Sequence, residues 1–449
     1  MIHFGLTSYA ATVLYCGFIV AFLLSVFWRP IVGVYFLVPL IPLQTARYYL
    51  IGLPLGQSVI DITLLGVALG LLLHSQRVFP KTPWNVLLSV YAIFTFVSLC
   101  LGSLYLGSEL PFSLGDPRLA DWKNYIVMPL ILVLVAATVQ NTKQMKILVL
   151  LMCAATLMLN RGFWDTVSGR DFSQFSYDLR DAGGMGYAGV NGFAAFEAQF
   201  VTLLLALAAF RGKLLVKLGY ATLALFSAIC LMYSLSRGGY LALVAGCLFL
   251  GIVKQRKLIV LLAVLACTWT TVMPRAVQQR VLMTYNENSG ELDHSAELRV
   301  DLWNEAVGMI RANPIFGAGF DTYAYTEHVH DYKDSHNYYL KVLAETGAVG
   351  LALVLWLLAK TFWRGYRLFR IAKDPFLASL GLGLAAWVVS CCIANCFGDR
   401  WTFLQVNGYM WVLGGLVARG WMLEREPLTS AIEEKSTGPD SEAAPEVAF

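Results

Sequence analysis

One histidine and three arginines have side chains suited to group-transfer chemistry: His336, Arg180, Arg237 and Arg299. A neutral imidazole can accept a proton near neutral pH, and a guanidinium group can hold a phosphate through two parallel hydrogen bonds. Together these residue types indicate proton abstraction beside a bound phosphate or diphosphate. The glycines that follow Arg180 and Arg237 would let such a ligand approach the backbone closely.

Each of these residues also has an interpretation that requires no function. A histidine at a helix start, as predicted for His336, is often an ordinary polar surface residue. Arg237 lies at a corner between two apolar runs and could extend along the membrane surface toward water. The other two arginines have acidic neighbours with which they could pair, namely Asp178 or Asp181 for Arg180 and Glu297 or Asp301 for Arg299.

Four further residues are candidates for supporting roles: Asn337, Asp399, Arg400 and Glu197. Asp399 and Arg400 share a short turn, where mutual pairing would explain both without any function. Glu197 falls inside a predicted membrane span. A carboxylate there is expected either to bind substrate or to be a hydrogen-bonded packing residue.

Two groups of residues could suggest a metal site. One is the cluster of His328, His330, Asp331 and Asp334, and the other is Cys391 with Cys392 and Cys396. The spacing of the first does not match the usual helical pairing of zinc ligands, and the second reads as small residues of an apolar helix. We therefore expect no metal and no cofactor.

The composition predicts an all-α membrane protein. Hydrophobic residues make up 58% of the chain, charged residues make up 14%, and the mean hydropathy is +0.63. The apolar runs are each long enough to cross ~30 Å of hydrocarbon and predict a polytopic bundle of about 12 transmembrane helices. The net charge of +4 is scattered over short loops, so no nucleic-acid partner is expected. The nine cysteines fall in or beside apolar runs, which argues against a disulfide framework.

Basic clusters in alternate loops give the orientation of the bundle, because Lys and Arg concentrate in cytoplasmic loops. The opposite face then receives residues 105–121, 161–188, 274–347, the corner Ser234–Gly238 and the corner Phe397–Trp401. All three candidate arginines, Arg400 and His336 share this face. The stretch Pro30–Arg47, interrupted by two prolines, is predicted to be a partial crossing.

Four regions follow from this pattern: residues 1–273 with transmembrane helices 1 to about 10, a polar outer segment at 274–347, the last transmembrane helices at 348–419, and a disordered cytoplasmic tail at 420–449. Within the outer segment, apolar spacing predicts an amphipathic helix over 295–312 that ends at Asn313-Pro314. A second helix is predicted to begin at His336, with Ser335 as its N-cap and Gly347 as its end.

Several motifs, taken in order, resemble the bacterial O-antigen ligase and polysaccharide polymerase superfamily. They are Ser236-Arg237-Gly238, Arg299 with Trp303, Asn313-Pro314-Ile315-Phe316-Gly317-Ala318-Gly319, His336-Asn337-Tyr338-Tyr339-Leu340, and Glu345-Thr346-Gly347-Ala348-Val349-Gly350. The glycine-rich stretch from Arg180 to Asn191 fits less specifically. The resemblance spans roughly residues 180 to 400, with its most distinctive part at 299 to 350. It implies a GT-C-like helical bundle.

The resemblance also implies an activity. An enzyme of this kind is a ligase that transfers a glycan from undecaprenyl diphosphate to an acceptor hydroxyl, such as a lipid A core sugar, at the periplasmic face of the bacterial inner membrane. By this resemblance the reaction is inverting and needs no metal. His336 would be the general base, Arg237 and Arg299 would hold the diphosphate with Arg180, and Asp399 would orient the base or an arginine.

Two other functions remain as alternatives. A polymerase of the same superfamily would pass the growing glycan to another lipid-linked repeat, and its donor chemistry would be the same. A transporter of a lipid-linked glycan would also combine a polytopic bundle with arginines near a cavity. The expected partners are the lipid-linked donor, a glycan acceptor and the lipids of the inner membrane.

Overall fold

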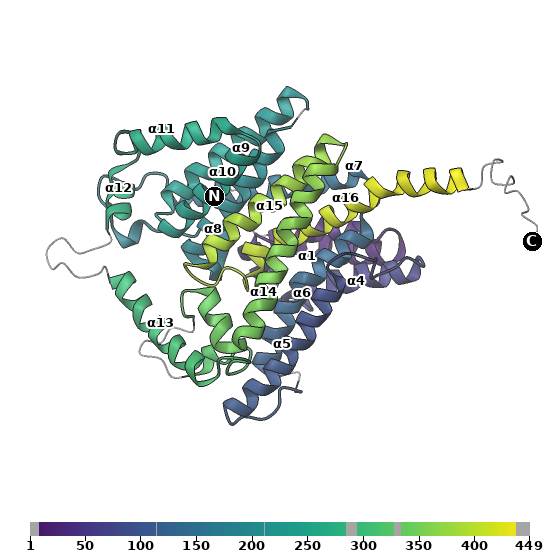
Figure 1. Cartoon of the computed structure of the whole chain (residues 1–449), viewed down its shortest axis with the longest axis horizontal. Helices are drawn as coiled ribbons and strands as arrows, with labels where there is room; N and C mark the ends of the chain where they lie inside the picture. Colours follow the sequence, from purple (N-terminus) through teal and green to yellow (C-terminus); the bar gives the residue numbers. More distant parts are fainter. Residues whose placement is uncertain (1–8, 114, 211, 284–293, 327–333, 437–449) are drawn as a thin grey trace, which may run out of the picture.

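The computed structural model describes residues 9–113, 115–210, 212–283, 294–326 and 334–436, and all regular structure in these ranges is helical (Figure 1). Nine helices in this part of the chain are long and apolar enough to cross a membrane. The number is ten if the bent pair α11 and α12 forms one span. The prediction of an all-α, multi-pass membrane protein is confirmed, whereas the predicted count of about 12 crossings is not reached by these helices.

The first half of the chain forms α1 (Ala10–Phe27), α2 (Ile31–Leu40), α3 (Gln44–Tyr48), η1 (Gly56–Ser58), α4 (Val59–Leu73), α5 (Asn85–Tyr105), α6 (Pro117–Thr138), α7 (Thr142–Val167), η2 (Tyr177–Leu179), η3 (Gly183–Ala188) and α8 (Gly189–Ala208). The second half forms α9 (Leu214–Tyr233), α10 (Arg237–Val253), α11 (Arg256–Val272), α12 (Arg275–Leu282), α13 (His294–Ala312), η4 (Tyr323–Tyr325), α14 (Tyr338–Ile371), α15 (Pro375–Asn395) and α16 (Leu404–Ser436).

The predicted partial crossing is α2, which has 10 residues and contains Pro39. A helix of this length spans only about 15 Å, half of the hydrocarbon layer. The chain then forms the short helix α3 before it enters α4. Residues Pro30–Arg47 therefore do not make a full crossing, as the prolines predicted.

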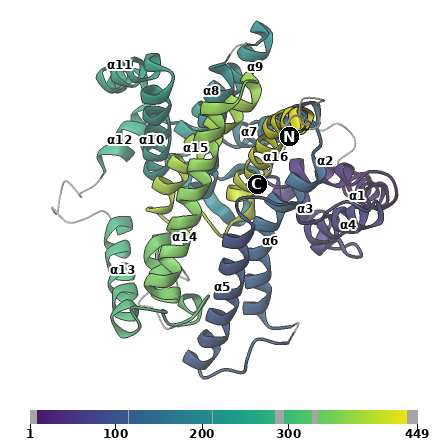
Figure 2. The ribbon, with the colours of Figure 1, turned by 45° about the vertical axis from the view of Figure 1, so that its right-hand side comes forward.

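The centre of the bundle is formed by α8 and α15, which are buried along most of their length. Trp387 of α15 meets Phe196 and Phe200 of α8 edge to face, with ring centres 6.4 and 6.3 Å apart. By contrast, α11 lies at the edge of the bundle (Figures 1 and 2) and has one buried residue, Leu258. The most deeply packed part of the bundle is therefore the contact between α8 and α15.

The predicted amphipathic helix of the outer segment is α13. Its bounds agree with the prediction, and Leu298, Leu302 and Ala306 form a buried stripe against α14. The helix ends directly before Asn313 and Pro314, as expected from the fixed backbone angle of proline. Before it, α11 and α12 meet at an angle of 113°.

The start of α14 corrects one prediction. The N-cap is Asn337, whose side chain accepts hydrogen bonds from the backbone N–H groups of Tyr339 and Leu340 at 3.1 and 3.3 Å. Ser335 does not cap the helix; its hydroxyl donates to the carbonyl of Asn337. His336 therefore precedes the helix, in a left-handed conformation with φ of 52°.

Gly347 breaks α14, as the sequence predicted. Its φ is 65°, a conformation that glycine adopts without steric cost. A β-carbon at this position would lie 2.2 Å from the carbonyl oxygen of Ile315, so the two backbones touch. The turns before Gly347 belong to the site described below, and those after it form a long apolar helix.

The carboxyl-terminal helix extends further than predicted. The disordered tail was expected from residue 420, but α16 continues to Ser436 and projects from the bundle in Figure 1. Several Glu, Leu and Ala residues in this stretch favour a helix even where little apolar surface can be buried. Residues 437–449 of the predicted tail lie outside the described residues.

Candidate functional site

Several connections that are far apart in the sequence meet at one end of the bundle, which we call the site face. They include the loop before α8, the corner before α10, the corner before α16 and the chain on either side of α13. Hydrogen bonds join them: Ser236 to Asn191, the Asp399 backbone to Asp334, and the Phe320 backbone to Ser98 of α5. The predicted outer segments therefore do share a face.

Four arginines approach one another on the site face, and we call Arg180, Arg237, Arg280 and Arg299 the arginine cluster. Arg180 is half-buried in the loop before α8. Burial, together with the positive charges of Arg280 and Arg299, lowers its pKa to about 10. A guanidinium whose pKa is lowered by two others must lie close to both. The structure thus gathers all three predicted arginines with one that the sequence had not singled out.

Neutral oxygens hold two of these arginines in place. The side-chain oxygen of Asn191, in the first turn of α8, accepts hydrogen bonds from Arg180 Nη2 and Ser236 Oγ, each 2.8 Å long. Arg237 Nη1 donates to the backbone carbonyl of Met283, directly after α12. Both acceptors are neutral oxygens, so these two contacts bring no negative charge to the guanidinium groups.

Arg280 is the member that sequence reasoning missed. Its side chain is 3% exposed, and its guanidinium carbon lies 5.0 Å from the ring centre of Phe175 and 5.5 Å from that of Tyr177. The aromatic faces stabilise the buried cation. The signal available in the sequence was an arginine on the disfavoured face of the membrane, which Arg280 shares with the other three.

The predicted pairing of Arg180 with a nearby aspartate is not what the structure shows. Asp181 instead forms an ion pair with Arg170 at 2.8 Å, and Arg170 also donates to the carbonyl of Asp178 at 3.0 Å. Arg170 therefore takes the carboxylate of Asp181, and Arg180 turns toward Asn191. This observation favours the binding interpretation of Arg180 over the structural one.

His336 belongs to a second polar group on the site face. Its Nδ1 lies 3.3 Å from Asp334 Oδ2, and its backbone N–H donates to Asp334 Oδ1 at 3.2 Å. Burial favours the neutral form of Asp334. The hydrogen bond from His336 and the charges of Lys341 and Arg400 outweigh this effect, and they lower the pKa of Asp334 to about 2. Asp334 is therefore ionised at neutral pH and fixes the orientation of the imidazole ring.

Asp399 and Arg400 continue this group, but they do not pair in the predicted way. Asp399 forms its ion pair with Lys341 at 3.3 Å, accepts from Thr402 Oγ1 at 2.8 Å, and donates its backbone N–H to Asp334 at 3.3 Å. Burial lowers the pKa of Arg400, and the charges of Asp334 and Asp399 oppose that change. Asp399 thus supports the aspartate that orients His336.

The arginine cluster and the His336 group adjoin through two packed corners. A β-carbon on Gly238, next to Arg237, would lie 3.0 Å from Cβ of Phe397. Phe397 is the first residue of the corner that contains Asp399 and Arg400. The amino terminus of α10 therefore packs against that corner. The structure therefore places His336 beside the region of the arginines, on the same face of the bundle.

Glu197, a predicted supporting residue, lies elsewhere. Its side chain is fully buried in the interior of α8, and neither carboxylate oxygen has a hydrogen-bond partner. The neighbouring Asn160 donates to Ser227 at 2.8 Å rather than to Glu197. The structure places Glu197 in the packed core, with the polar side chains of Asn160 and Ser227 beside its carboxyl group, which fits the packing role rather than substrate binding.

The structure describes the candidate cysteine cluster completely and the candidate histidine cluster only in part. All nine cysteines are described and free, which confirms the expectation of no disulfide framework. Within the described ranges, no three His, Cys, Asp or Glu side chains are arranged to hold a metal ion. His328, His330 and Asp331 of the loose cluster lie outside the described residues.

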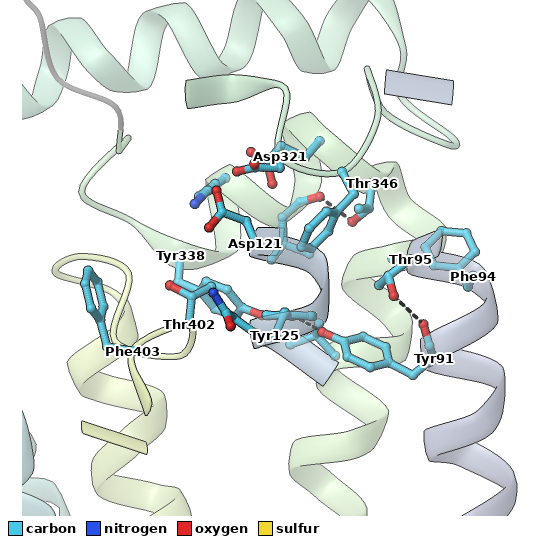
Figure 3. Close-up of a pocket in the computed structure, with 17 residues that line it drawn as sticks. Tyr91, Phe94, Thr95, Asp121, Tyr125, Asp321, Tyr338, Thr346, Thr402 and Phe403 are labelled. Atoms are coloured by element: carbon cyan, nitrogen blue, oxygen red, sulfur yellow. Dashed lines mark hydrogen bonds between the residues drawn. The ribbon is translucent and has the colours of Figure 1, made fainter. Parts of the chain in front are cut away.

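A cavity of about 300 Å³ lies beside the His336 group, between α5, α6 and the first turns of α14 (Figure 3). Its charged lining residues are Asp121, Asp321, Glu345 and Lys341. Sequence reasoning missed all four. The one available signal was the spacing of Lys341 and Glu345, which places both on the same face of a helix.

The comparison with known families agrees with this region of the chain. Residues 222–355 match the family model described as O-antigen ligase. The matched segment contains Arg237, Arg280, Arg299 and His336, while Arg180 and Asp399 lie outside it. No significant match was found among curated proteins. The resemblance predicted from the sequence is confirmed for residues 222–355, and this match supports the O-antigen ligase superfamily as the family of the chain.

Proposed function

We propose that this protein is a ligase of the O-antigen type, which transfers a glycan from undecaprenyl diphosphate to an acceptor hydroxyl at the periplasmic face of the bacterial inner membrane. One observation carries the proposal: one buried and three half-buried arginines from four separate segments gather on the same face of the bundle as an oriented His–Asp pair. The family match over residues 222–355 covers most of these residues and supports the same substrate class.

The arginine cluster suits a departing diphosphate. When the bond between the anomeric carbon and the phosphate oxygen breaks, the electron pair leaves with the diphosphate and its negative charge increases. Arginines held by neutral oxygens and aromatic rings can neutralise that charge through paired hydrogen bonds. Arg180 keeps its positive charge at neutral pH because its pKa, although lowered, is about 10.

The His336–Asp334 pair suits activation of the acceptor. With Nδ1–H donating to ionised Asp334, Nε2 carries the lone pair that can accept a proton. The acceptor oxygen would attack the anomeric carbon from the face opposite the diphosphate, and its proton would pass to Nε2. One such displacement forms one C–O bond, breaks one C–O bond and inverts the anomeric configuration.

The acceptor distinguishes the remaining alternatives. We favour a ligase that uses a lipid A core sugar as the acceptor. A polymerase would instead produce longer lipid-linked chains from the same donor. A transporter of the lipid-linked glycan would leave the carrier intact. The gathering of the arginines at one face of the bundle favours transfer over transport.

The test is a transfer assay in vesicles that contain the purified full-length chain, an undecaprenyl-diphosphate glycan and lipid A core. The wild-type chain should form the glycosylated core and keep doing so in EDTA. His336→Ala should reduce turnover by about 10²- to 10⁴-fold, because a general base is lost. His74→Ala is the matched control: His74 bonds the carbonyl of Gly70 at the end of α4, far along the chain from this site, and its loss should leave turnover unchanged.

Three results would contradict the proposal. Wild-type turnover in the His336→Ala variant would show that His336 is not the general base. Intact carrier redistributed between leaflets, without a new glycosidic bond, would show transport instead. Elongated carrier-linked glycan as the main product would identify a polymerase.

A further inference from the structure

The cavity beside the His336 group has a charge opposite to that of the arginine cluster. Asp121 of α6, Asp321 of the chain between α13 and α14, and Glu345 of α14 line it together with one cation, Lys341. Lys341 is already paired with Asp399 at 3.3 Å. The cavity thus has three carboxyl groups and one ammonium group, and the ammonium group is already paired. This makes the cavity a poor site for a phosphate or any other anion.

The hydrogen-bonding capacity of these carboxyl groups is only partly used. Glu345 Oε1 accepts from the backbone N–H of Tyr323 at 3.2 Å. Asp321 Oδ2 is buried and has no hydrogen-bond partner. A buried carboxylate oxygen without a partner costs free energy that a bound hydroxyl or ammonium donor would recover. Because Asp321 lines the cavity, a ligand there could provide such a donor.

Aromatic rings form a large part of the remaining cavity wall. Tyr91, Tyr125 and Tyr338 are linked through their hydroxyl groups, with the Tyr125–Tyr338 contact at 2.8 Å. Phe320 packs on Tyr125, with ring centres 5.1 Å apart. Figure 3 shows Asp121 and Asp321 near each other, with the three tyrosines in a row to one side. Polar acceptors opposite apolar rings suit a ligand with many hydroxyl groups and an apolar face, which describes a sugar ring.

The cavity and the proposed base are parts of one structure. Tyr338 begins the helix directly after the His336–Asn337 cap, and Lys341 follows one turn later. Asp399 contacts Lys341 and Thr402, both of which line the cavity, and its backbone N–H donates to the aspartate that orients His336. The cavity is therefore connected to the His336 group through Asp399 and Lys341.

We propose that this cavity, lined by Asp121, Asp321, Glu345 and aromatic rings, is a subsite for the acceptor, and that it takes a neutral or amino-bearing sugar ring and rejects phosphorylated or uronic sugars. The inference rests on the proposed function, because it names the class of acceptor that the same site would use. The sugar hydroxyls donate to the carboxylates, one ring face packs on the aromatic wall, and a hydroxyl at the open side faces His336.

A binding experiment on the full-length chain separates this inference from the transfer reaction. Methyl glucoside, glucosamine and glucuronic acid serve as neutral, amino-bearing and anionic probes at pH 8, with saturation-transfer NMR as the readout. The protein would be wild type and His336→Ala, which should bind the probes equally. We expect glucosamine and methyl glucoside to bind and glucuronic acid to bind at least about tenfold more weakly, because it meets carboxylates of the same charge.

Two isosteric variants locate the site. Asp321→Asn and Glu345→Gln should each weaken binding of glucosamine by about tenfold, because a charge-assisted hydrogen bond becomes a neutral one. Asp171→Asn is the matched control, since Asp171 is an exposed carboxylate that bonds Ser173. The melting temperature of each variant shows whether it is folded. In the transfer assay, the two cavity variants should raise the KM for acceptor and leave the KM for the lipid-linked donor unchanged.

The possible results are distinct. Selective sugar binding that depends on Asp321 and Glu345, in a protein that shows no transfer, would contradict the proposed function and support the cavity as a sugar site. Transfer without any change in acceptor KM in the two variants would overturn the subsite alone. Failure of all three probes to bind the wild type, or equal binding of glucuronic acid and glucosamine, would also overturn it.

Discussion

The two polar regions of the site face are built in opposite ways. Arg180 and Arg237 are anchored by neutral oxygens of Asn191 and Met283, and Arg280 lies between aromatic rings. In the cavity, a single lysine is surrounded by carboxyl groups. One region is therefore built from cations, and the other is lined mainly by carboxyl groups. The difference indicates that two chemically unlike ligands bind on either side of His336.

Such a separation has a physical use in a transfer reaction. An anionic leaving group is drawn to the arginines and repelled by the cavity, while an acceptor rich in hydroxyl groups prefers the carboxylates. The imidazole lies where the two ligands would meet. Substitutions that affect one ligand and spare the other are therefore the sharpest tests of the comparison.

Among the substitutions that separate the two regions, the largest effect is expected at the arginines. Arg237→Ala should lower kcat/KM for the lipid-linked donor by about 10²- to 10³-fold, because a group that stabilises the developing charge is lost. Arg237→Lys should recover only a small part of this, since one ammonium group cannot make a two-point contact with diphosphate. Both are measured by transfer kinetics with donor varied, and glucosamine binding in the cavity is the control that should not change. A lysine variant of near-normal activity would argue against the clamp.

The second-largest effect is expected on the stability of the protein, at the lysine that lines the acidic cavity. Lys341→Met removes the cation that pairs with Asp399, in a site where the two side chains are 14% and 3% exposed. The unfolding free energy should fall by about 3 kcal/mol, because a buried carboxylate loses its partner. Lys123→Met is the matched control, as its pair with Asp61 is far more exposed and should be worth at most about 1 kcal/mol. Denaturant unfolding in detergent measures both, and equal losses would contradict the contrast.

A smaller effect is expected at the anchor of the arginine cluster. Asn191→Ala removes the oxygen that holds Arg180 and Ser236, so Arg180 should become less well positioned. Donor kcat/KM should fall by about tenfold, the equivalent of one net hydrogen bond, while acceptor KM stays constant. Asn85→Ala, at the start of α5, serves as control because Asn85 bonds Pro80 away from the site. A shift in acceptor KM instead would mean that the two regions are not separate.

The smallest effect is a change in the pH dependence of stability. Burial raises the pKa of Asp321 from 3.8 to about 7, with Lys341 opposing the shift and Asp121 and Asp399 adding to it. The folded chain therefore holds a proton that the unfolded chain releases above pH 3.8, and stability falls as the pH rises toward 7. In Asp321→Asn this contribution disappears, and melting temperatures between pH 5 and pH 8 should decline less steeply than in the wild type. An unchanged slope would show that the pKa of Asp321 is not raised in the folded chain.

Much of the fold could be predicted because membrane helices obey local rules. The apolar runs, the partial crossing at Pro30–Arg47, the helix over 295–312 and the break at Gly347 all follow from hydropathy, proline and glycine. The predictions at Ser335 and at residue 420 were wrong for a similar local reason. Asn337 is as good a cap as serine, and helix-forming residues continued α16 beyond the last apolar run.

The site was predictable only in part. His336, Arg180, Arg237 and Arg299 were found because their side chains suit group transfer and because they fit a known family's order of motifs. Arg280 carries the same signal but lies in no motif. Asp334 appeared in the sequence only as a possible metal ligand, and its role beside the imidazole depends on the left-handed turn at His336.

The sequence by itself determined the class of protein, the membrane face of the polar segments and the residue types able to transfer a proton and hold a diphosphate. These follow from the free energy of placing each short stretch in water or hydrocarbon, which depends on neighbouring residues alone. Only the tertiary structure decided that four arginines share one region and that Asp121, Asp321 and Glu345 share another. Charges from distant helices interact through space, and their distances are set by the packing of α8, α14 and α15 rather than by their order in the chain.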